Sequence, residues 1–260
     1  MTPSLPLSVP DWCFFQQWHD KPDAYYQQLH HLGITGVEMV EQGRWSIARQ
    51  AGLRLMNISG PGMADGLNNP AHHAELVTQL GETITLARQH DISAVIVFSG
   101  NRHGIATDEG IENCITSLQQ LVPLAEKAGV TLLFEMLNAF DHADYQADHS
   151  AFGFEIVRRI NSPSVRVLYD IYHMQRMDED VIRDLVDNIE YIGHIHVAES
   201  PRRTRPVAAG VLSYRDIIPA VIAAGYRGYW GLEFLPEGDA MDEIAKAVSD
   251  MQHCNTVMNS

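Results

Sequence analysis

Short apolar runs alternate with longer amphipathic stretches along almost the whole chain. The runs are rich in Val, Ile and Leu, and Ala94–Phe98 is apolar at every position. Strands have this character when both of their faces are covered, as in parallel sheets. The runs that we interpret as strands are Trp12–Phe15, Gly36–Val40, Leu53–Ile58, Ala94–Phe98, Val130–Glu135, Val165–Asp170, Tyr191–Val197 and Tyr229–Phe234. Helical patterns lie between them, near residues 22–32, 44–51, 71–90, 108–128, 150–161, 178–189, 213–224 and 240–252.

The number of units predicts the fold class. Eight strand–helix units in 260 residues average about 32 residues each, which is the size of a βαβ repeat. The pattern therefore predicts an α/β protein with a (β/α)8 TIM barrel, as a single domain over residues 1–260. A doubly wound sheet is the alternative, but it usually carries a glycine-rich phosphate turn after its first strand. Here Gln16, Gln17 and Trp18 follow the first run, and the pattern G-x-G-x-x-G does not occur.

Charge and composition exclude several classes of partner. The chain has 18 Lys and Arg against 33 Asp and Glu, a net charge of −15. Such a charge repels phosphodiesters, so we expect neither a nucleic-acid nor a membrane partner. No apolar run approaches the roughly 18 residues of a membrane span. Three scattered cysteines and an N-terminus without a signal-peptide pattern lead us to expect a cytoplasmic protein.

Four consecutive predicted strands end in residues that can bind a metal or transfer a proton. Glu135 and Asp170 are the last residues of their predicted strands, and His196 and Glu233 stand one residue before the ends of theirs, at spacings of about one repeat. In a TIM barrel the active site lies at the carboxyl ends of the strands. We therefore expect these four side chains to converge at one rim. The competing interpretation gives each residue its own structural role, such as a helix cap, an ion-pair partner or, for His196, a core histidine.

A cluster of three carboxylates needs positive charge. Buried carboxylates repel one another, and a divalent cation would keep them ionised while binding their oxygens. Three carboxylates and one imidazole are mainly hard ligands, which favours Mn²⁺ or Mg²⁺, and Co²⁺ or Zn²⁺ can also bind through the histidine. The predicted cofactor is one divalent metal ion.

The same segments resemble a known family. The residues that carry the resemblance are Gly36–Glu38, Phe134–Glu135 with Asn138, Tyr169–Met174, Gly193–Val197 and Gly231–Phe234. On these the chain resembles the xylose isomerase-like TIM-barrel superfamily of sugar phosphate isomerases and epimerases. The stretches Asp170–Gln175 and Gly193–Ala198 look most like the hydroxypyruvate isomerase group.

The resemblance implies roles for individual residues. It implies that Glu135, Asp170, His196 and Glu233 hold the metal, that Glu135 and Glu233 form the acid/base pair, and that His173 contacts substrate. The implied reaction interconverts a small α-hydroxy ketone and an aldehyde through an enediolate, with hydroxypyruvate giving tartronate semialdehyde. One position departs from the group, because hydroxypyruvate isomerases tend to carry Gln where this chain has His196, whereas ketose epimerases carry His.

The substrate is less constrained than the reaction. A keto acid needs a cation for its carboxylate, and Arg202 and Arg203 after the seventh strand are the first candidates, followed by Arg102. A ketose 3-epimerase and a 2-oxo-tetronate isomerase of the same fold are the alternatives, so the expected partner is a small hydroxy-keto acid or a ketose. An endonuclease IV-like metal-dependent hydrolase is a distant alternative that the net charge opposes. A homo-oligomer is left open.

Overall fold

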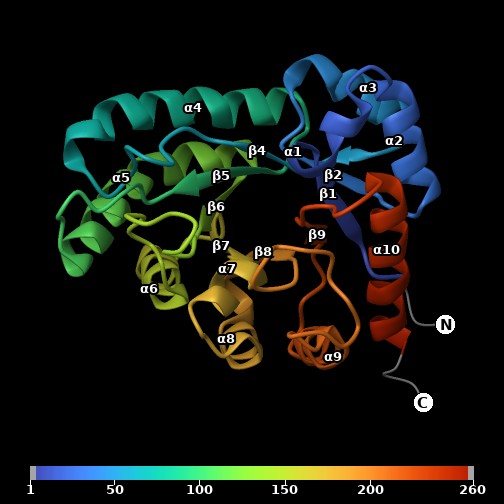
Figure 1. Ribbon diagram of the computed structural model, residues 1–260. Coiled ribbons are helices and arrows are strands. Elements are labelled where there is room, and N and C mark those ends of the chain that lie inside the picture. Colours follow the sequence, from blue (N-terminus) through green and yellow to red (C-terminus); the bar gives the residue numbers. More distant parts are fainter. Residues whose placement is uncertain (1–3, 257–260) are drawn as a thin grey trace. The chain divides into compact units, whose positions relative to one another are not determined.

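The computed structural model describes residues 4–256, and these form two compact units (Figure 1). The first unit contains residues 4–56, Val181–Ile189 and residues 195–256. The second unit contains Asn57–Asp180 and Glu190–His194. The expectation of a single domain over residues 1–260 stays a prediction.

The first unit combines the amino-terminal and carboxyl-terminal parts of the chain. Its strands follow the order β3-β2-β1-β9-β8, and every neighbouring pair in this order is parallel. Its elements, with the end of β8, are β1 (Leu7–Pro10), α1 (Asp11–Phe14), η1 (Phe15–Trp18), α2 (Pro22–His31), β2 (Gly36–Glu38), η2 (Gln42–Arg44), α3 (Trp45–Gln50), β3 (Arg54–Leu55), α8 (Val181–Asp187), β8 (Ile192–Val197), α9 (Tyr214–Ala223), β9 (Trp230–Leu232) and α10 (Ala240–Thr256).

The second unit is a regular succession of strands and helices. Its strands β4, β5, β6 and β7 are neighbours in this order and pair in parallel. The elements are β4 (Asn57–Ser59), η3 (Pro70–His72), α4 (His73–Gln89), β5 (Ala94–Phe98), α5 (Thr107–Ala128), β6 (Thr131–Glu135), α6 (Ser150–Ile160), β7 (Val165–Asp170) and α7 (Ile171–Arg176). The short helix η4 (Ile189–Tyr191) and strand β8 each have residues in both units.

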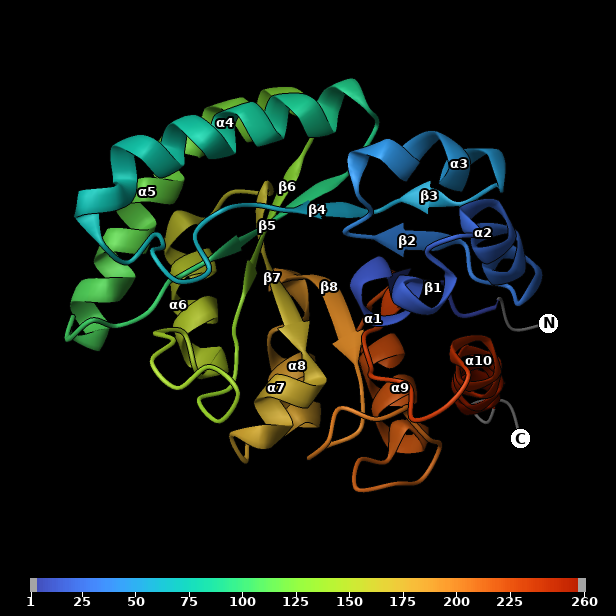
Figure 2. The ribbon, with the colours of Figure 1, turned by 45° about the horizontal axis from the view of Figure 1, so that its top comes forward.

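Helices cover the strands of the second unit on their outer side (Figure 2). Helix α4 packs on β5, α5 on β6, and α6 on β7. All five residues of β5 are buried, as are four of the five in β6. This agrees with the nearly continuous apolar character of both segments, since a parallel strand between helices and core has no solvent-facing side.

Gly129 shows how the sequence ends one of these helices. It is the C-cap of α5, with φ +65° and ψ +34°, in the left-handed region that glycine adopts without steric cost. The chain turns there and enters β6 two residues later. The glycine therefore sets where the strand that ends in Glu135 begins.

Two strand predictions need correction. Trp12–Phe15 is not the first strand, because β1 occupies Leu7–Pro10, Trp12–Phe14 lie in helix α1 and Phe15 begins η1. Pro10 has no N–H for a further ladder bond, and its extended backbone is the N-cap of that helix. The run Leu53–Ile58 is not one strand either, because it divides at Met56 into β3 and β4. Residues 4–256 therefore contain nine strands where the sequence pattern predicts eight.

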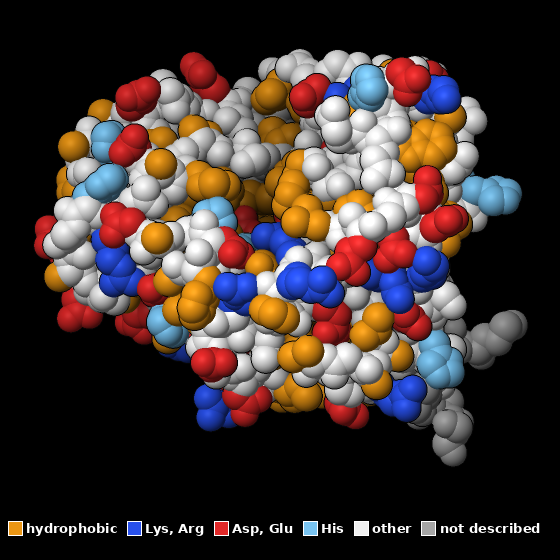
Figure 3. Space-filling model, viewed as in Figure 1, with side chains coloured by type: hydrophobic (Ala, Val, Ile, Leu, Met, Phe, Trp, Pro, Cys, Tyr) orange, Lys and Arg blue, Asp and Glu red, His pale blue; other side chains and the backbone are white. Residues whose placement is uncertain are grey.

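Acidic and basic side chains are interspersed with apolar ones on the face shown in Figure 3. Among the described residues, no helix is both long enough and apolar enough to span a bilayer.

Candidate active site

Two buried carboxylates end neighbouring strands of the second unit. Glu135 is the last residue of β6 and Asp170 the last residue of β7, and their exposed fractions are 6% and 1%. The strands are parallel, with Glu135 opposite Leu168, so their carboxyl ends lie at the same edge. The hydroxyl of Tyr145 donates to the main-chain oxygen of Glu135 at 2.9 Å, which fixes the end of the strand.

Asp170 is also the N-cap of helix α7. Its Oδ1 accepts hydrogen bonds from the backbone N–H groups of Tyr172, at 2.8 Å, and His173, at 3.4 Å. The other oxygen, Oδ2, lies 3.5 Å from Nε2 of His173. An N-cap carboxylate is held in one orientation and is stabilised in its ionised form by the start of the helix. Asp170 is therefore a preorganised anionic oxygen.

In the first unit, three buried residues form a chain that ends at the imidazole of His196. Ser8 Oγ donates to Glu38 Oε1 at 2.6 Å, and Glu38 Oε2 lies 2.9 Å from Nε2 of His196. Ser8, Glu38 and His196 all have an exposed fraction of 0%. An ionised carboxylate can only accept, so Nε2 of His196 carries a proton. The remaining ring nitrogen, Nδ1, lies 2.8 Å from Oε2 of Glu233.

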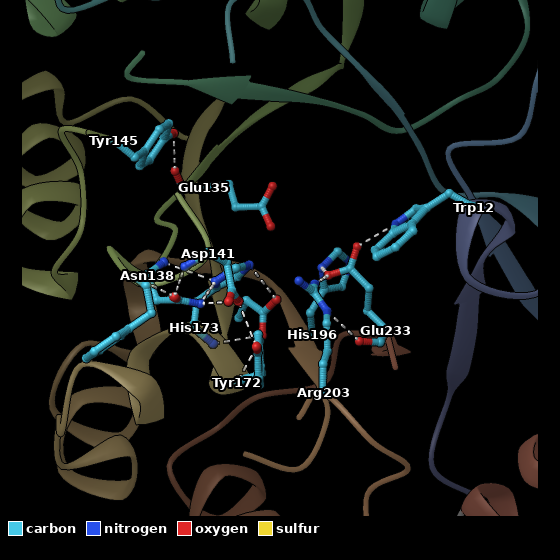
Figure 4. Close-up of polar contacts among 12 residues, drawn as sticks. Trp12, Glu135, Asn138, Asp141, Tyr145, Tyr172, His173, His196, Arg203 and Glu233 are labelled. Carbon is cyan, nitrogen blue, oxygen red and sulfur yellow. Dashed lines mark hydrogen bonds and ion pairs between the residues drawn. The ribbon is translucent and has the colours of Figure 1, made fainter. Parts of the chain in front are cut away.

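Glu233 follows β9 directly and is surrounded by donors (Figure 4). Trp12 Nε1 donates to its Oε1 at 2.9 Å, and the guanidinium of Arg203 donates to its Oε2 and, through Nε, to its main-chain oxygen at 3.1 Å. The guanidinium carbon of Arg203 also lies 5.3 Å from the centre of the Trp12 ring. These contacts hold the carboxylate of Glu233 between the loop after β8 and helix α1.

The neighbouring charges keep Glu233 ionised. Burial alone would raise the pKa of Glu233, but the charges of His196 and Arg203 outweigh burial and lower it well below its usual range. Burial would likewise lower the pKa of His196, but the carboxylates of Glu233 and Glu38 raise it well above 6.5. Glu233 is thus a carboxylate at neutral pH, able to accept a proton or to bind a cation.

Comparison with known proteins identifies the family of the chain. The family model described as xylose isomerase-like TIM barrel matches residues 26–253. The chain belongs to the xylose isomerase-like TIM-barrel family. Its fold class is therefore the α/β TIM barrel that the strand–helix alternation predicts, and the resemblance found in the sequence is confirmed.

Relatives within the xylose isomerase-like family carry isomerase names. The chain is 23% identical over 192 residues to the putative hydroxypyruvate isomerase of Xenopus laevis, which covers 72% of this chain and 70% of that protein. It is 33% identical over 124 residues to the 2-oxo-tetronate isomerase of Cupriavidus necator, covering 46% and 47%. Relatives with these names support an isomerase-type enzyme.

A solved structure extends the likeness of fold. The crystal structure titled AP endonuclease, family 2, from Brucella melitensis superimposes with a TM-score of 0.80 at 23% identity, covering 93% of this chain and 97% of that one. At this identity the likeness shows the fold alone.

The donor groups of this family member suit a divalent cation. Buried acidic and imidazole groups that could hold a metal ion include Glu135 and Asp170 in the second unit and His196 and Glu233 in the first. Nδ1 of His196 lies 2.8 Å from Glu233 Oε2, and the raised pKa of His196 puts a proton between these atoms; without that proton, Nδ1 directs an electron pair at the carboxylate. Two atoms that each present an electron pair at this distance require positive charge between them, which a proton or a metal ion can supply. The residues therefore fit the predicted group.

The arginines predicted to bind substrate differ in position. Arg203 is mostly buried and contacts Glu233. The side chain of Arg202 is 73% exposed and pairs with Glu237 at 3.1 Å, and Arg102 pairs with Asp148 at 2.6 Å. The structure therefore brings Arg203 to a predicted site residue of the first unit, whereas Arg202 and Arg102 form ion pairs with carboxylates that are not predicted site residues.

Two contacts of the site are absent from the sequence prediction. Glu38 ends β2 just as Glu135 ends β6, so the rule of strand ends could have indicated it. The sequence pattern places Trp12 in a strand, whereas its indole N–H bond to Glu233 depends on its position in helix α1. No local pattern indicates that second contact.

Proposed function

We propose that this protein is a metal-dependent isomerase that converts hydroxypyruvate to tartronate semialdehyde through an enediolate. The family membership and the isomerase names of the relatives support the reaction class. The three cysteines, Cys13, Cys114 and Cys254, are buried and are not joined by disulfide bonds. They agree with the reducing cytoplasm that we propose as its compartment.

One observation carries the metal dependence. The Nε2–H of His196 donates a hydrogen bond to Glu38, and Nδ1 lies 2.8 Å from Glu233. A histidine held by a carboxylate in this way is the usual arrangement of a metal ligand. In a TIM barrel the carboxyl ends of the strands share one rim. We therefore propose that Glu135 and Asp170 bind the same ion as His196 and Glu233, with Mn²⁺ or Mg²⁺ preferred.

The two glutamates would move the proton. Hydroxypyruvate becomes tartronate semialdehyde when a proton leaves its hydroxymethyl carbon, a proton returns to the former keto carbon, and the hydroxyl proton passes to the former keto oxygen. One glutamate removes the first proton and the other returns one, and Glu233, which is ionised before substrate arrives, can take the first of these roles. A bound divalent ion would supply electrostatic stabilisation of the negative charge that develops on the substrate oxygens.

Arg203 is the proposed partner of the substrate carboxylate. It already lies against the carboxylate of Glu233, and Trp12 packs near its guanidinium. A guanidinium matches a carboxylate with two parallel N–H donors. Arg202 remains a second candidate on sequence grounds, and the two residues can be separated by mutation.

The experiment is an assay of the metal-stripped protein after addition of a single metal. Mn²⁺, Mg²⁺, Co²⁺ and Zn²⁺ are each added with hydroxypyruvate in D₂O, and proton NMR follows deuterium exchange and tartronate semialdehyde. We expect deuterium exchange and tartronate semialdehyde with Mn²⁺ or Mg²⁺ in the wild-type protein. We expect neither signal in Glu135→Gln or Glu233→Gln. The matched control is Glu109→Gln, which changes an exposed glutamate on α5 and should leave the rate unchanged. Turnover that persists without metal, or in either of the two site variants, would contradict the proposal.

A ketose 3-epimerase is the second candidate, because His196 is the residue that ketose epimerases carry at this position. The same preparation tested with a panel of ketoses decides between the two. Exchange at C3 of a ketose without conversion of hydroxypyruvate would replace the first proposal with the second. Cleavage of abasic-site DNA would instead favour a hydrolase, which the net charge of −15 opposes.

A further inference from the structure

The ring of His173 accepts two hydrogen bonds on one nitrogen. The backbone N–H of Asn138 lies 3.0 Å from Nδ1 of His173, and the side-chain nitrogen Nδ2 of Asn138 lies 2.6 Å from the same atom (Figure 4). Both residues are buried, with exposed fractions of 0% for Asn138 and 1% for His173. A single residue in the loop after β6 thus holds the histidine at the start of α7.

The orientation of the Asn138 amide is determined by its other contacts. Its Oδ1 accepts from the backbone N–H groups of Phe140, at 3.0 Å, and Asp141, at 2.9 Å. Its Nδ2 lies 2.9 Å from Oδ2 of Asp141, an atom that also accepts from the hydroxyl of Tyr172 at 2.7 Å. Exchange of oxygen and nitrogen would direct the nitrogen at two N–H donors and the oxygen at a carboxylate. The nitrogen of the amide therefore faces His173.

This contact fixes where the imidazole carries its proton. Nδ1 faces two N–H donors, so it must present its electron pair, and the proton of the neutral ring lies on Nε2. A proton on Nδ1 would point at the two Asn138 donors. Nε2 lies 3.5 Å from Oδ2 of Asp170, at the end of β7. The N–H of His173 is therefore directed toward the strand ends of the second unit.

The neutral form of His196 has the same tautomer as His173, but its two ring nitrogens face the opposite kinds of partner. Its Nε2–H donates to Glu38, and in the neutral ring the electron pair of Nδ1 faces Glu233. In His173 the electron pair of Nδ1 is taken by Asn138, and the N–H of Nε2 faces the carboxylate of Asp170. One imidazole is thereby arranged as a ligand and the other as a hydrogen-bond donor.

We propose that Asn138 is a positioning residue that keeps His173, which the family resemblance already predicts to contact substrate, as a neutral donor whose Nε2–H is the group that meets a substrate oxygen. The role as substrate donor rests on the function proposed above, whereas the tautomer does not. His173 then stabilises negative charge on that oxygen and does not exchange protons with the substrate carbons.

The tautomer is tested in the protein without substrate. Long-range proton–nitrogen NMR spectra of the histidine rings should show Nδ1 of His173 without a proton and Nε2 with one. Asn138→Asp replaces the Nδ2 donor by an acceptor and should move the proton signal toward Nδ1. Asn161→Asp, at an exposed asparagine after α6, is the matched control and should leave the His173 signals unchanged. A proton on Nδ1 in the wild-type protein would overturn the inference, whatever reaction the protein catalyses.

The donor role is tested by two amide substitutions. The side-chain nitrogen of Gln can reach the position of Nε2, whereas that of Asn can reach only the position of Nδ1. We therefore expect His173→Gln to keep most of kcat/KM, and His173→Asn to lose roughly 100-fold, the usual effect of removing one such donor. Equal losses in both variants would overturn the donor role. Absence of any turnover in the wild-type protein would overturn the proposed function and this role, while the NMR spectra would still decide the pairing of Asn138 with His173.

Discussion

The carboxylate of Glu38 lies 2.9 Å from Nε2 of His196, across 158 positions of sequence and in a fully buried environment. Because Ser8 donates to the second oxygen of Glu38, both oxygens of this carboxylate have a donor. The imidazole of His196 is therefore fixed in orientation, with a proton on Nε2. Its Nδ1 faces Glu233, so Glu38 on β2 orients the side chain of His196 near the end of β8.

Removing this carboxylate should weaken metal binding. We expect Glu38→Ala to lower the affinity for Mn²⁺ by about 10- to 100-fold, the usual effect of losing the partner of a histidine ligand. The Mn²⁺ affinity of Glu38→Gln should lie between those of the wild-type protein and Glu38→Ala, since the Gln carbonyl still accepts from Nε2 but carries no charge. Electron paramagnetic resonance of free Mn²⁺ measures the affinity, with Glu109→Gln as control. Unchanged affinity in a folded Glu38→Ala protein would contradict this role.

The two adjacent arginines should respond differently to the same substitution. Arg203→Gln removes a charge that contacts Glu233 and should raise KM for hydroxypyruvate by roughly 10- to 100-fold, the worth of a hydrogen bond to a charged group. Arg202→Gln changes an exposed side chain and should leave KM within about twofold. Steady-state kinetics of both variants decide this. A larger effect at Arg202 would transfer the substrate-binding role to that residue.

Asp170→Asn separates the structural role of Asp170 from its charge. Asn is as good an N-cap as Asp, so helix α7 and the stability of the metal-free protein should change little. The stabilisation by Mn²⁺ should disappear, whereas the wild-type protein gains about 2.7 kcal/mol when Mn²⁺ is present at 100 times its Kd. Thermal unfolding with and without Mn²⁺ measures both quantities. Equal stabilisation of the two proteins would exclude Asp170 as a ligand.

Asp11 should make stability depend on pH. It is 2% exposed and contacts Tyr26 and Arg44. Burial raises its pKa from 3.8 to about 6, although the hydrogen bonds from these two partners act to lower it. The native state then binds more protons than the unfolded state between these values, so the free energy of unfolding falls as pH rises from about 4 to about 6. Relative to Asp11→Asn, the wild-type protein should lose up to about 3 kcal/mol over this range.

Urea unfolding of the wild-type protein and of Asp11→Asn at several pH values tests this. Asp23→Asn, at an exposed position near the start of α2, is the control and should follow the wild-type curve. A difference between wild type and Asp11→Asn that does not vary with pH would show that Asp11 titrates at its ordinary pKa.

The sequence predicts strand ends better than contacts between strands. Glu135 and Asp170 stand at strand ends because nearly continuous apolar runs mark buried parallel strands clearly. The prediction of a strand at the short run Trp12–Phe15 is wrong, since four apolar residues have no period that separates strand from helix. The first strand lies just before it, where Pro6 and Pro10 obscure the pattern.

Tautomers and contacts lie beyond a single sequence. The pairing of Glu38 with His196 joins two strands that are far apart in the chain. The effect of Asn138 on His173 depends on a loop conformation in which one amide oxygen accepts two backbone N–H groups. Neither relation follows from composition, spacing or periodicity, because each is set by how distant segments pack.

The most direct measurement is the anomalous diffraction of a crystal soaked in Mn²⁺. We predict one Mn²⁺ ion bound by oxygens of Glu135, Asp170 and Glu233 and by Nδ1 of His196. An ion bound by only two of these residues, or at another place in the protein, would contradict the claim that the four strand-end side chains form a single metal site.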